Sequence, residues 1–185
     1  MTATVNLLTS GYVNDRVASS VVLVRENDAI IVVDPGMVAH RNKILDPLRE
    51  LGVHEDQVTD VIFSHHHPDH TLNAALFSRA RFHDVWAIYF NDVWADRTDV
   101  IKGAPSVSLL DTPGHTSEDV STLIETAEGL VVCTHLWWSV AGPVVDPLAQ
   151  DQGLLESSRT AVLALSPMLI IPGHGAPFTP EQLGP

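Results

Sequence analysis

The chain has 185 residues, of which 45% are hydrophobic, and a formal net charge of −13 at pH 7. This length suits one domain, residues 1–185, which would bury about 70% of the surface of its unfolded chain. Such a domain needs no disulfide to fold, and a single cysteine could not form one within the chain. The acidic charge disfavours nucleic acid and membrane partners, and no apolar run approaches the about 18 residues of a bilayer-spanning helix.

The N-terminal segment shows no targeting signal. Residues 1–6 contain neither a basic region nor a long apolar stretch, so we expect no signal peptide. The single cysteine agrees with a reducing compartment. Together these features predict a cytoplasmic protein.

The first third of the chain reads as strands followed by a helix. Two runs rich in β-branched residues, 17–24 and 29–33, predict strands, and the polar residues 25–28 between them predict a hairpin turn. Residues 40–51 place their apolar side chains on one helical face, and Gly52 predicts the end of that helix.

A ligand-rich loop follows the next predicted strand, residues 58–63. Four imidazoles and one carboxylate lie within residues 65–70, and Pro68 prevents the segment from continuing as a strand. Imidazole nitrogen and carboxylate oxygen are ligands that borderline metals such as Zn²⁺ prefer. The turn would let four side chains point inward together: His65, His67, Asp69 and His70. A histidine-rich surface loop is the competing interpretation.

The middle of the chain alternates between apolar and polar segments. Residues 71–78 predict a short helix and residues 81–88 a strand, in which His83 is expected at the surface or beside a ligand rather than as a ligand. The polar residues 89–102 are interpreted as a loop that could line a cleft with Trp94, although Trp94 could equally belong to the core.

Two further histidines follow strand-like runs in the second half. Residues 107–110 lead into Pro-Gly-His115, and residues 168–171 lead into Pro-Gly-His174. Three strand ends that deliver histidine into turns are hard to attribute to chance, so these positions are candidate metal ligands. The helical spacing of apolar residues in 152–165 predicts a second amphipathic helix.

The intervening segment predicts a hairpin, with strands at residues 120–124 and 130–134. Cys133 lies inside the second strand and is expected to be a buried core residue rather than a nucleophile. Trp137 and Trp138 follow, and we expect one in the core and the other beside the cleft.

The ordered set of ligands, His65-x-His67-x-Asp69-His70 followed by His115 and His174, resembles the metallo-β-lactamase fold superfamily. Residues 69–77 and 171–178 are most similar to its small branch around metallo-β-lactamase domain-containing protein 1. The periodicity alone indicates a β-rich, layered protein with helices. The resemblance implies an α/β fold, a four-layer αβ/βα sandwich in a single compact domain.

The resemblance also implies a ligand assignment. One ion would be held by His65, His67 and His115, and a second by Asp69, His70 and His174. Zn²⁺ is expected, as one or two ions, and iron is possible. Asp34, in an Asp-x-Gly turn, would either orient a ligating histidine or serve only as a turn residue.

The chain departs from the family at the carboxylate that usually bridges both ions, because His135 occupies that position. A neutral imidazole offers one lone pair and ligates one ion at most. Three outcomes follow: His135 joins the second ion, the second ion binds weakly, or His135 turns away and one ion remains. Alternatively the bridge comes from elsewhere, such as Asp146.

The function implied is a metal-dependent hydrolase that directs a metal-activated hydroxide at a small ester, thioester, lactone or amide. Asp69 would be catalytic, orienting the hydroxide and carrying a proton to the leaving group. The alternatives are an iron-dependent oxidoreductase of the sulfur dioxygenase kind, a nuclease-type phosphodiester hydrolase, which the acidic charge disfavours, and a non-enzymatic metal-binding protein. A small-molecule substrate is the expected partner, and the oligomeric state, monomer or homodimer, is left open.

Overall fold

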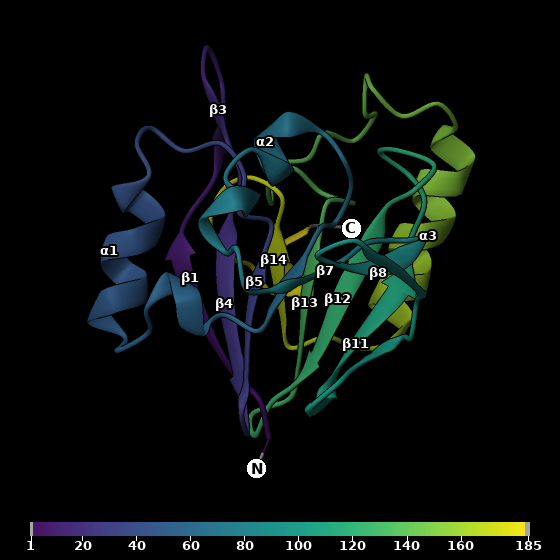
Figure 1. The fold of residues 1–185 in the computed structure, drawn as a ribbon. Coiled ribbons are helices and arrows are strands. Elements are labelled where there is room, and N and C mark those ends of the chain that lie inside the picture. Colours follow the sequence, from purple (N-terminus) through teal and green to yellow (C-terminus); the bar gives the residue numbers. More distant parts are fainter. Residues whose placement is uncertain (1, 184–185) are drawn as a thin grey trace.

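The computed structural model describes residues 2–183, which form two β-sheets packed face to face. The larger sheet contains, in spatial order, β1 (Thr4–Thr9), β4 (Val21–Glu26), β5 (Ala29–Val33), β6 (Asp60–Ile62), β7 (Arg81–His83), β8 (Ala87–Phe90) and β9 (Val93–Asp96). The smaller sheet contains β10 (Val100–Ile101), β11 (Ala104–Asp111), β12 (Val120–Glu125), β13 (Leu130–Thr134) and β14 (Leu169–Pro172). A separate hairpin pairs β2 (Tyr12–Val13) with β3 (Val17–Ala18) and projects beyond the sheets (Figure 1).

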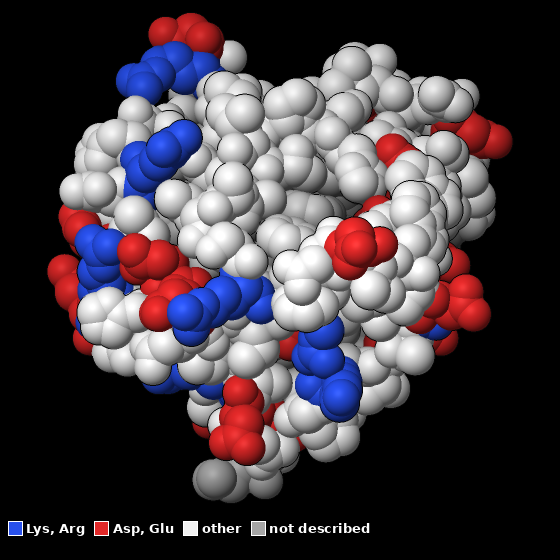
Figure 2. Space-filling model, in the orientation of Figure 1, with Lys and Arg blue, Asp and Glu red and all other residues white. Residues whose placement is uncertain are grey.

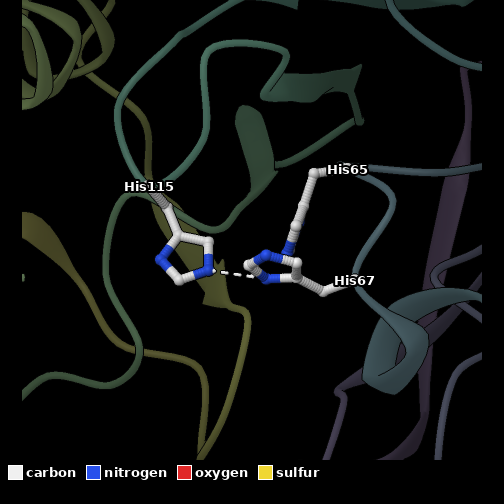
Figure 3. A group of neighbouring side chains, drawn as sticks. All are labelled: His65, His67 and His115. Carbon is white, nitrogen blue, oxygen red and sulfur yellow. Dashed lines mark hydrogen bonds between the residues drawn. The ribbon is translucent and has the colours of Figure 1, made fainter. Parts of the chain in front are cut away.

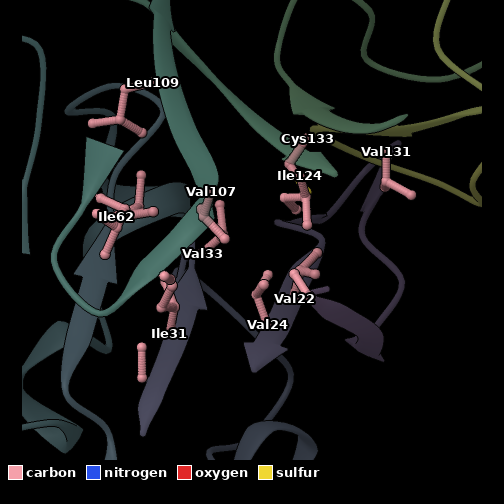
Figure 4. Packing of buried hydrophobic residues seen from close by; sticks show 14 of the residues in the cluster. Val22, Val24, Ile31, Val33, Ile62, Val107, Leu109, Ile124, Val131 and Cys133 are labelled. Atoms are coloured by element: carbon pink, nitrogen blue, oxygen red, sulfur yellow. The ribbon is translucent and has the colours of Figure 1, made fainter. Parts of the chain in front are cut away.

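The space between the sheets holds the main hydrophobic core (Figure 4). Side chains alternate along each strand, so Val22 and Val24 of β4 face the smaller sheet while Leu23 faces the opposite side. The inward side chains meet their counterparts from the smaller sheet, among them Ile124 of β12 and Val131 of β13. This alternation explains why both runs of β-branched residues are buried on two faces.

Helices cover the outer face of each sheet (Figure 1). Helix α1 (Asn42–Glu50) buries Ile44 and Leu48 against the larger sheet. Helix α3 (Gln152–Ala164) buries Leu155 and Val162 against the smaller sheet. The sequence of layers is helix, sheet, sheet, helix, which confirms the predicted αβ/βα sandwich.

Short helices make the remaining connections: α2 (Pro68–Thr71), η1 (Glu55–Gln57), η2 (Ala74–Leu76) and η3 (Pro180–Leu183). Among the described residues no helix is long and apolar enough to cross a membrane.

Three local predictions were wrong. In place of the helix expected at residues 71–78, the structure has η2 and the end of α2 at Thr71. Leu72, expected on the apolar face of that helix, is 62% exposed. The strand expected at residues 81–88 is two antiparallel strands, β7 and β8. The loop expected at residues 89–102 instead contains the end of β8 and the strands β9 and β10, and Trp94 of β9 is 71% exposed rather than in the core. Cross-strand packing of Tyr89 on Trp94, with ring centroids 4.7 Å apart, stabilises the β8–β9 hairpin. Strand β1 was not predicted at all.

Candidate metal centre

The predicted ligands come from four loops that meet at one end of the sandwich. His65, His67 and the α2 residues follow β6, His115 lies between β11 and β12, His135 follows β13, and His174 follows β14. The space-filling view is hollowed at this end, and most of the surface around the hollow is free of Lys, Arg, Asp and Glu (Figure 2). The fold therefore gathers the candidate ligands at one end of the molecule.

The first group consists of His65, His67 and His115. One ring nitrogen from each lies within 4.8 Å of the others, a spacing that could hold a metal ion. The rings of His67 and His115 approach from opposite sides, with Nδ1 of His67 3.0 Å from Nε2 of His115 (Figure 3). The structure thus brings together the three side chains assigned to one ion.

The second group consists of Asp69, His70 and His174, whose ligand atoms also lie within 4.8 Å of one another. Oδ2 of Asp69 is 3.4 Å from Nε2 of His70 and 3.6 Å from Nε2 of His174. Nδ1 of His174 donates to the carbonyl of Ala18 at 2.8 Å, which leaves Nε2 facing Asp69. This group contributes two imidazoles and one carboxylate.

His135 lies between the two groups. Its buried ring is 4.1 Å from that of His115 and 4.6 Å from that of His70, measured between centroids. Its Nε2 is 3.2 Å from Nε2 of His174, and it forms a third possible group with His65 and His70. The ring of His135 therefore does not turn away from the two groups, while the number of ions stays a prediction.

Gly173 makes room for the His135 ring. A Cβ atom at residue 173 would lie 2.2 Å from Cδ2 of His135, far inside van der Waals contact. Glycine at residue 173, directly before His174, is thus required by packing against His135.

Asp34 orients His70. Its Oδ2 is 2.9 Å from Nδ1 of His70, and its carboxylate also accepts the backbone N–H and the hydroxyl of Ser64, both at 2.7 Å. The structure therefore supports the orienting role for Asp34. A carboxylate that accepts the Nδ1 proton directs Nε2 toward a ligand.

Asp146 does not bridge the two groups. Its Oδ2 accepts from Nδ1 of His115 at 2.8 Å and from the indole N–H of Trp138 at 2.9 Å, and its Oδ1 accepts from the N–H of Leu148. The alternative that Asp146 supplies the missing bridge is therefore wrong. Trp138 borders the centre while Trp137 is buried beside α3, so the two tryptophans diverge as expected.

Two buried acidic side chains near these loops were not singled out from the sequence. Asp119 accepts two hydrogen bonds from Thr116 and lies 3.9 Å from Nδ1 of His65, and burial raises its pKa to about 7. Asp60 pairs with His83 at 2.7 Å, so His83 is buried rather than at the surface and belongs to neither group. The Thr-x-x-Asp spacing of residues 116–119 was the available signal for Asp119.

The protonation of the centre suits a cation. Burial, followed by repulsion from neighbouring imidazoles, lowers the pKa of His65 and His135 well below the ordinary value, so both are neutral. Within residues 2–183, Nε2 of His65 and Nδ1 of His135 are buried without a hydrogen-bond partner. Burial opposes charge on His70, but Asp34 and Asp69 outweigh it and raise its pKa to about 9. Neutral nitrogen donors without partners, beside carboxylates that favour positive charge, fit a divalent metal ion.

Sequence comparison identifies relatives along most of the chain. The family model described as "Metallo-beta-lactamase superfamily" matches residues 14–136. Metallo-beta-lactamase domain-containing protein 1 of Xenopus laevis is 33% identical over 196 residues, which cover 94% of this chain and 80% of that protein. The human protein of the same name is 33% identical over 165 residues, and the chain spans only 59% of its length.

Solved structures share the fold. A Thermotoga maritima protein described as a candidate metallo-beta-lactamase superposes with a TM-score of 0.77 at 22% identity, over 97% of this chain and all of that one. AiiA from B. thuringiensis, with N-decanoyl-L-homoserine bound at its active site, gives a TM-score of 0.68 at 18% identity, over 94% of this chain and 92% of that one. The family match and the relatives lead to one conclusion: the chain belongs to the metallo-β-lactamase superfamily.

Proposed function

We propose that this protein is a metal-dependent hydrolase of a small ester, thioester, lactone or amide. The observation that carries the proposal is the pair of side-chain groups, each able to hold an ion, that lie together where four loops meet at one end of the sandwich. The formal net charge of −13 favours a small carbonyl compound over a phosphodiester backbone, which basic side chains would attract.

The residues would divide between two ions. His65, His67 and His115 would hold one, leaving an open position, and Asp69, His70 and His174 would hold the other. A divalent ion bound there supplies Lewis acidity, which lowers the pKa of a bound water from ~15.7 to about 7 and polarises the substrate oxygen. His135, between the groups, could add its nitrogen to either one but could not join them as a carboxylate does.

Asp69 is the residue proposed to act on the reacting groups. Burial alone would raise its pKa, but His70 and His174 outweigh burial and lower it to about 2, so its carboxylate is charged at neutral pH. A carboxylate with so low a pKa is a weak base. Its main contribution would be to orient the attacking water, and it would pass to the leaving group only a proton that it first takes up from that water.

The structural neighbours suggest which substrates to test first. Among them is an N-acyl homoserine lactone hydrolase with its product, N-hexanoyl-L-homoserine, bound at the catalytic metal centre (TM-score 0.67, 18% identity). At that identity the likeness shows the fold alone. It supports testing a lactone first, alongside an aryl ester and a thioester.

The test is hydrolysis by protein purified without chelator, assayed with p-nitrophenyl acetate, an acyl thioester and an N-acyl homoserine lactone. We expect turnover of at least one, loss of turnover on dialysis against a chelator, and recovery on adding Zn²⁺. His65→Ala should abolish turnover, while His40→Ala, an exposed histidine on the connection before α1, should not. Turnover that survives both the chelator and His65→Ala would contradict the proposal.

A second candidate is an iron-dependent oxidoreductase. Two imidazoles and one carboxylate, as in Asp69, His70 and His174, are the ligand set that non-haem Fe(II) oxygenases use. Metal analysis after purification, combined with O₂-uptake measurements on persulfide substrates, distinguishes the candidates. Iron with substrate-dependent O₂ uptake and no hydrolysis would favour the oxidoreductase. Bound ions with neither activity would favour a non-enzymatic metal-binding protein.

A further inference from the structure

We infer that Asp146 is a positioning residue that sets the metal affinity of the His65–His67–His115 group alone, and that Arg159, which hydrogen-bonds none of the ligands, holds Asp146 in place. This inference rests on the metal binding proposed above but does not require hydrolysis.

Asp146 meets His115 in a buried, fully satisfied arrangement. The carboxylate is 1% exposed and accepts from Nδ1 of His115, from the indole of Trp138 and from the N–H of Leu148. Accepting the Nδ1 proton fixes the tautomer in which Nε2 of His115 faces His67, and it makes that nitrogen a stronger donor. Asp146 therefore acts on an ion through His115.

The segment that carries Asp146 has little structure of its own. Residues 135–151 contain no helix or strand, and Val144 and Val145 are 80% and 68% exposed. Such a segment would sample many conformations unless other parts of the chain held it. The position of Asp146 consequently depends on contacts from outside the segment.

Two residues of α3 supply such contacts: Gln152 hydrogen-bonds the backbone N–H and carbonyl of Asp146, and Arg159 holds the loop that precedes it. The guanidinium of Arg159 is buried and donates to the carbonyls of Leu136 at 2.9 Å, Pro143 at 2.8 Å and Val144 at 3.1 Å. It also lies over the ring of Trp137, 5.7 Å from the centroid. One rigid fork thus fastens both ends of the loop that precedes Asp146 to a helix in the outer layer. A lysine could not reproduce this set, because it has no planar fork.

The chain provides a matched control on the other side of the centre. Asp34 makes the equivalent contact with Nδ1 of His70, a member of the Asp69–His70–His174 group. Asp34 reaches the first group only indirectly, because the Ser64 hydroxyl that it accepts lies 3.0 Å from Nδ1 of His65. Asp146 should therefore affect one ion, and Asp34 mainly the other.

The experiment is a Zn²⁺ titration of metal-free protein by calorimetry and by competition with a chromophoric chelator. Asp146→Asn preserves shape but removes the charge, and we expect one ion to bind about 10- to 100-fold more weakly. The same loss should appear when Asp146→Asn is added to His174→Ala, which leaves only the first group intact. It should disappear when Asp146→Asn is added to His115→Ala.

Arg159→Lys should weaken the binding of the same ion, less strongly than Asp146→Asn does. Asp34→Asn should weaken the binding of the other ion. Thermal unfolding of the metal-free variants checks that each folds. If Asp146→Asn does not fold, Arg159→Lys in the His115→Ala and His174→Ala backgrounds carries the same test.

The inference would be overturned if Asp146→Asn weakened the binding of both ions equally or left the Zn²⁺ affinity unchanged. It would also be overturned if Asp146→Asn still lowered the affinity in the His115→Ala background. Wild-type protein that binds no ion would refute the proposed function as well. Wild-type protein that binds ions with Asp146→Asn unaffected would refute this inference alone.

Discussion

Gly36 offers the sharpest test of how the fold positions the metal loop. It lies in the Asp34-Pro35-Gly36 turn and packs directly against the backbone of Asp69 and His70. A Cβ atom at residue 36 would lie 1.7 Å from the carbonyl oxygen of Asp69 and 2.5 Å from Cα of His70. Carbon needs about 3.5 Å to a non-bonded neighbour, so Gly36→Ala must displace the turn or the loop by about 1.8 Å.

That displacement exceeds what a metal centre tolerates. Ligand distances must hold to within about 0.2 Å, so the Asp69–His70–His174 group should lose its ion. Overpacking should also lower the free energy of unfolding by about 1–3 kcal/mol. Metal content by plasma mass spectrometry and thermal unfolding of the metal-free protein measure the two effects.

The matched control is Gly153→Ala. Residue 153 lies in the first turn of α3, where the added methyl would approach only the Asp151 side chain, at 3.2 Å. We expect Gly153→Ala to keep both the metal content and the stability. Wild-type metal content and stability in Gly36→Ala would refute the reasoning, because the close approach of the turn to the loop would then not constrain the centre.

Three further predictions concern buried groups. Burial would raise the pKa of Asp60, but hydrogen bonds from His83, Arg81 and Thr59 outweigh burial and lower this pKa. The free energy of unfolding that Asp60 contributes is therefore complete above pH ~4 and is lost as the pH falls below that value. Asp60→Asn should therefore cost about 3–5 kcal/mol at pH 7 and flatten the acid limb in chemical unfolding, whereas an unchanged limb would contradict this. His135→Asp should strengthen binding of a second Zn²⁺ by restoring a bridging carboxylate, and titration that shows no gain would contradict the alignment of this position. Burial raises the pKa of Cys133, so iodoacetamide should label it only upon unfolding, and labelling of the folded protein would place it elsewhere.

The convergence of the candidate ligands could be predicted from sequence because each of the four loops that carry them follows a strand. The local pattern of apolar run, turn and histidine is visible without any tertiary information. The carboxylates that orient them are harder to predict, because Asp146 lies 31 residues from His115, on a segment that Arg159 and Gln152 contact through hydrogen bonds. No local pattern encodes such a contact.

The missed β8–β9 hairpin did carry a local signal. Asn27-Asp28 joins β4 to β5, and the same dipeptide, Asn91-Asp92, joins β8 to β9. Both asparagines adopt positive φ, 51° and 53°, as two-residue hairpin turns require. The first turn was interpreted correctly because buried β-branched runs flank it. The second was not, because β9 is fully exposed and shows no buried face.

The central claim is that histidines from separate loops converge to bind a cation. Anomalous diffraction at the zinc and iron edges, from crystals grown without chelator, tests it most directly. The account predicts a peak about 2.0–2.1 Å from ring nitrogens of His65, His67 and His115, with a second among Asp69, His70 and His174. No anomalous peak at either group in crystals supplied with Zn²⁺ would contradict it.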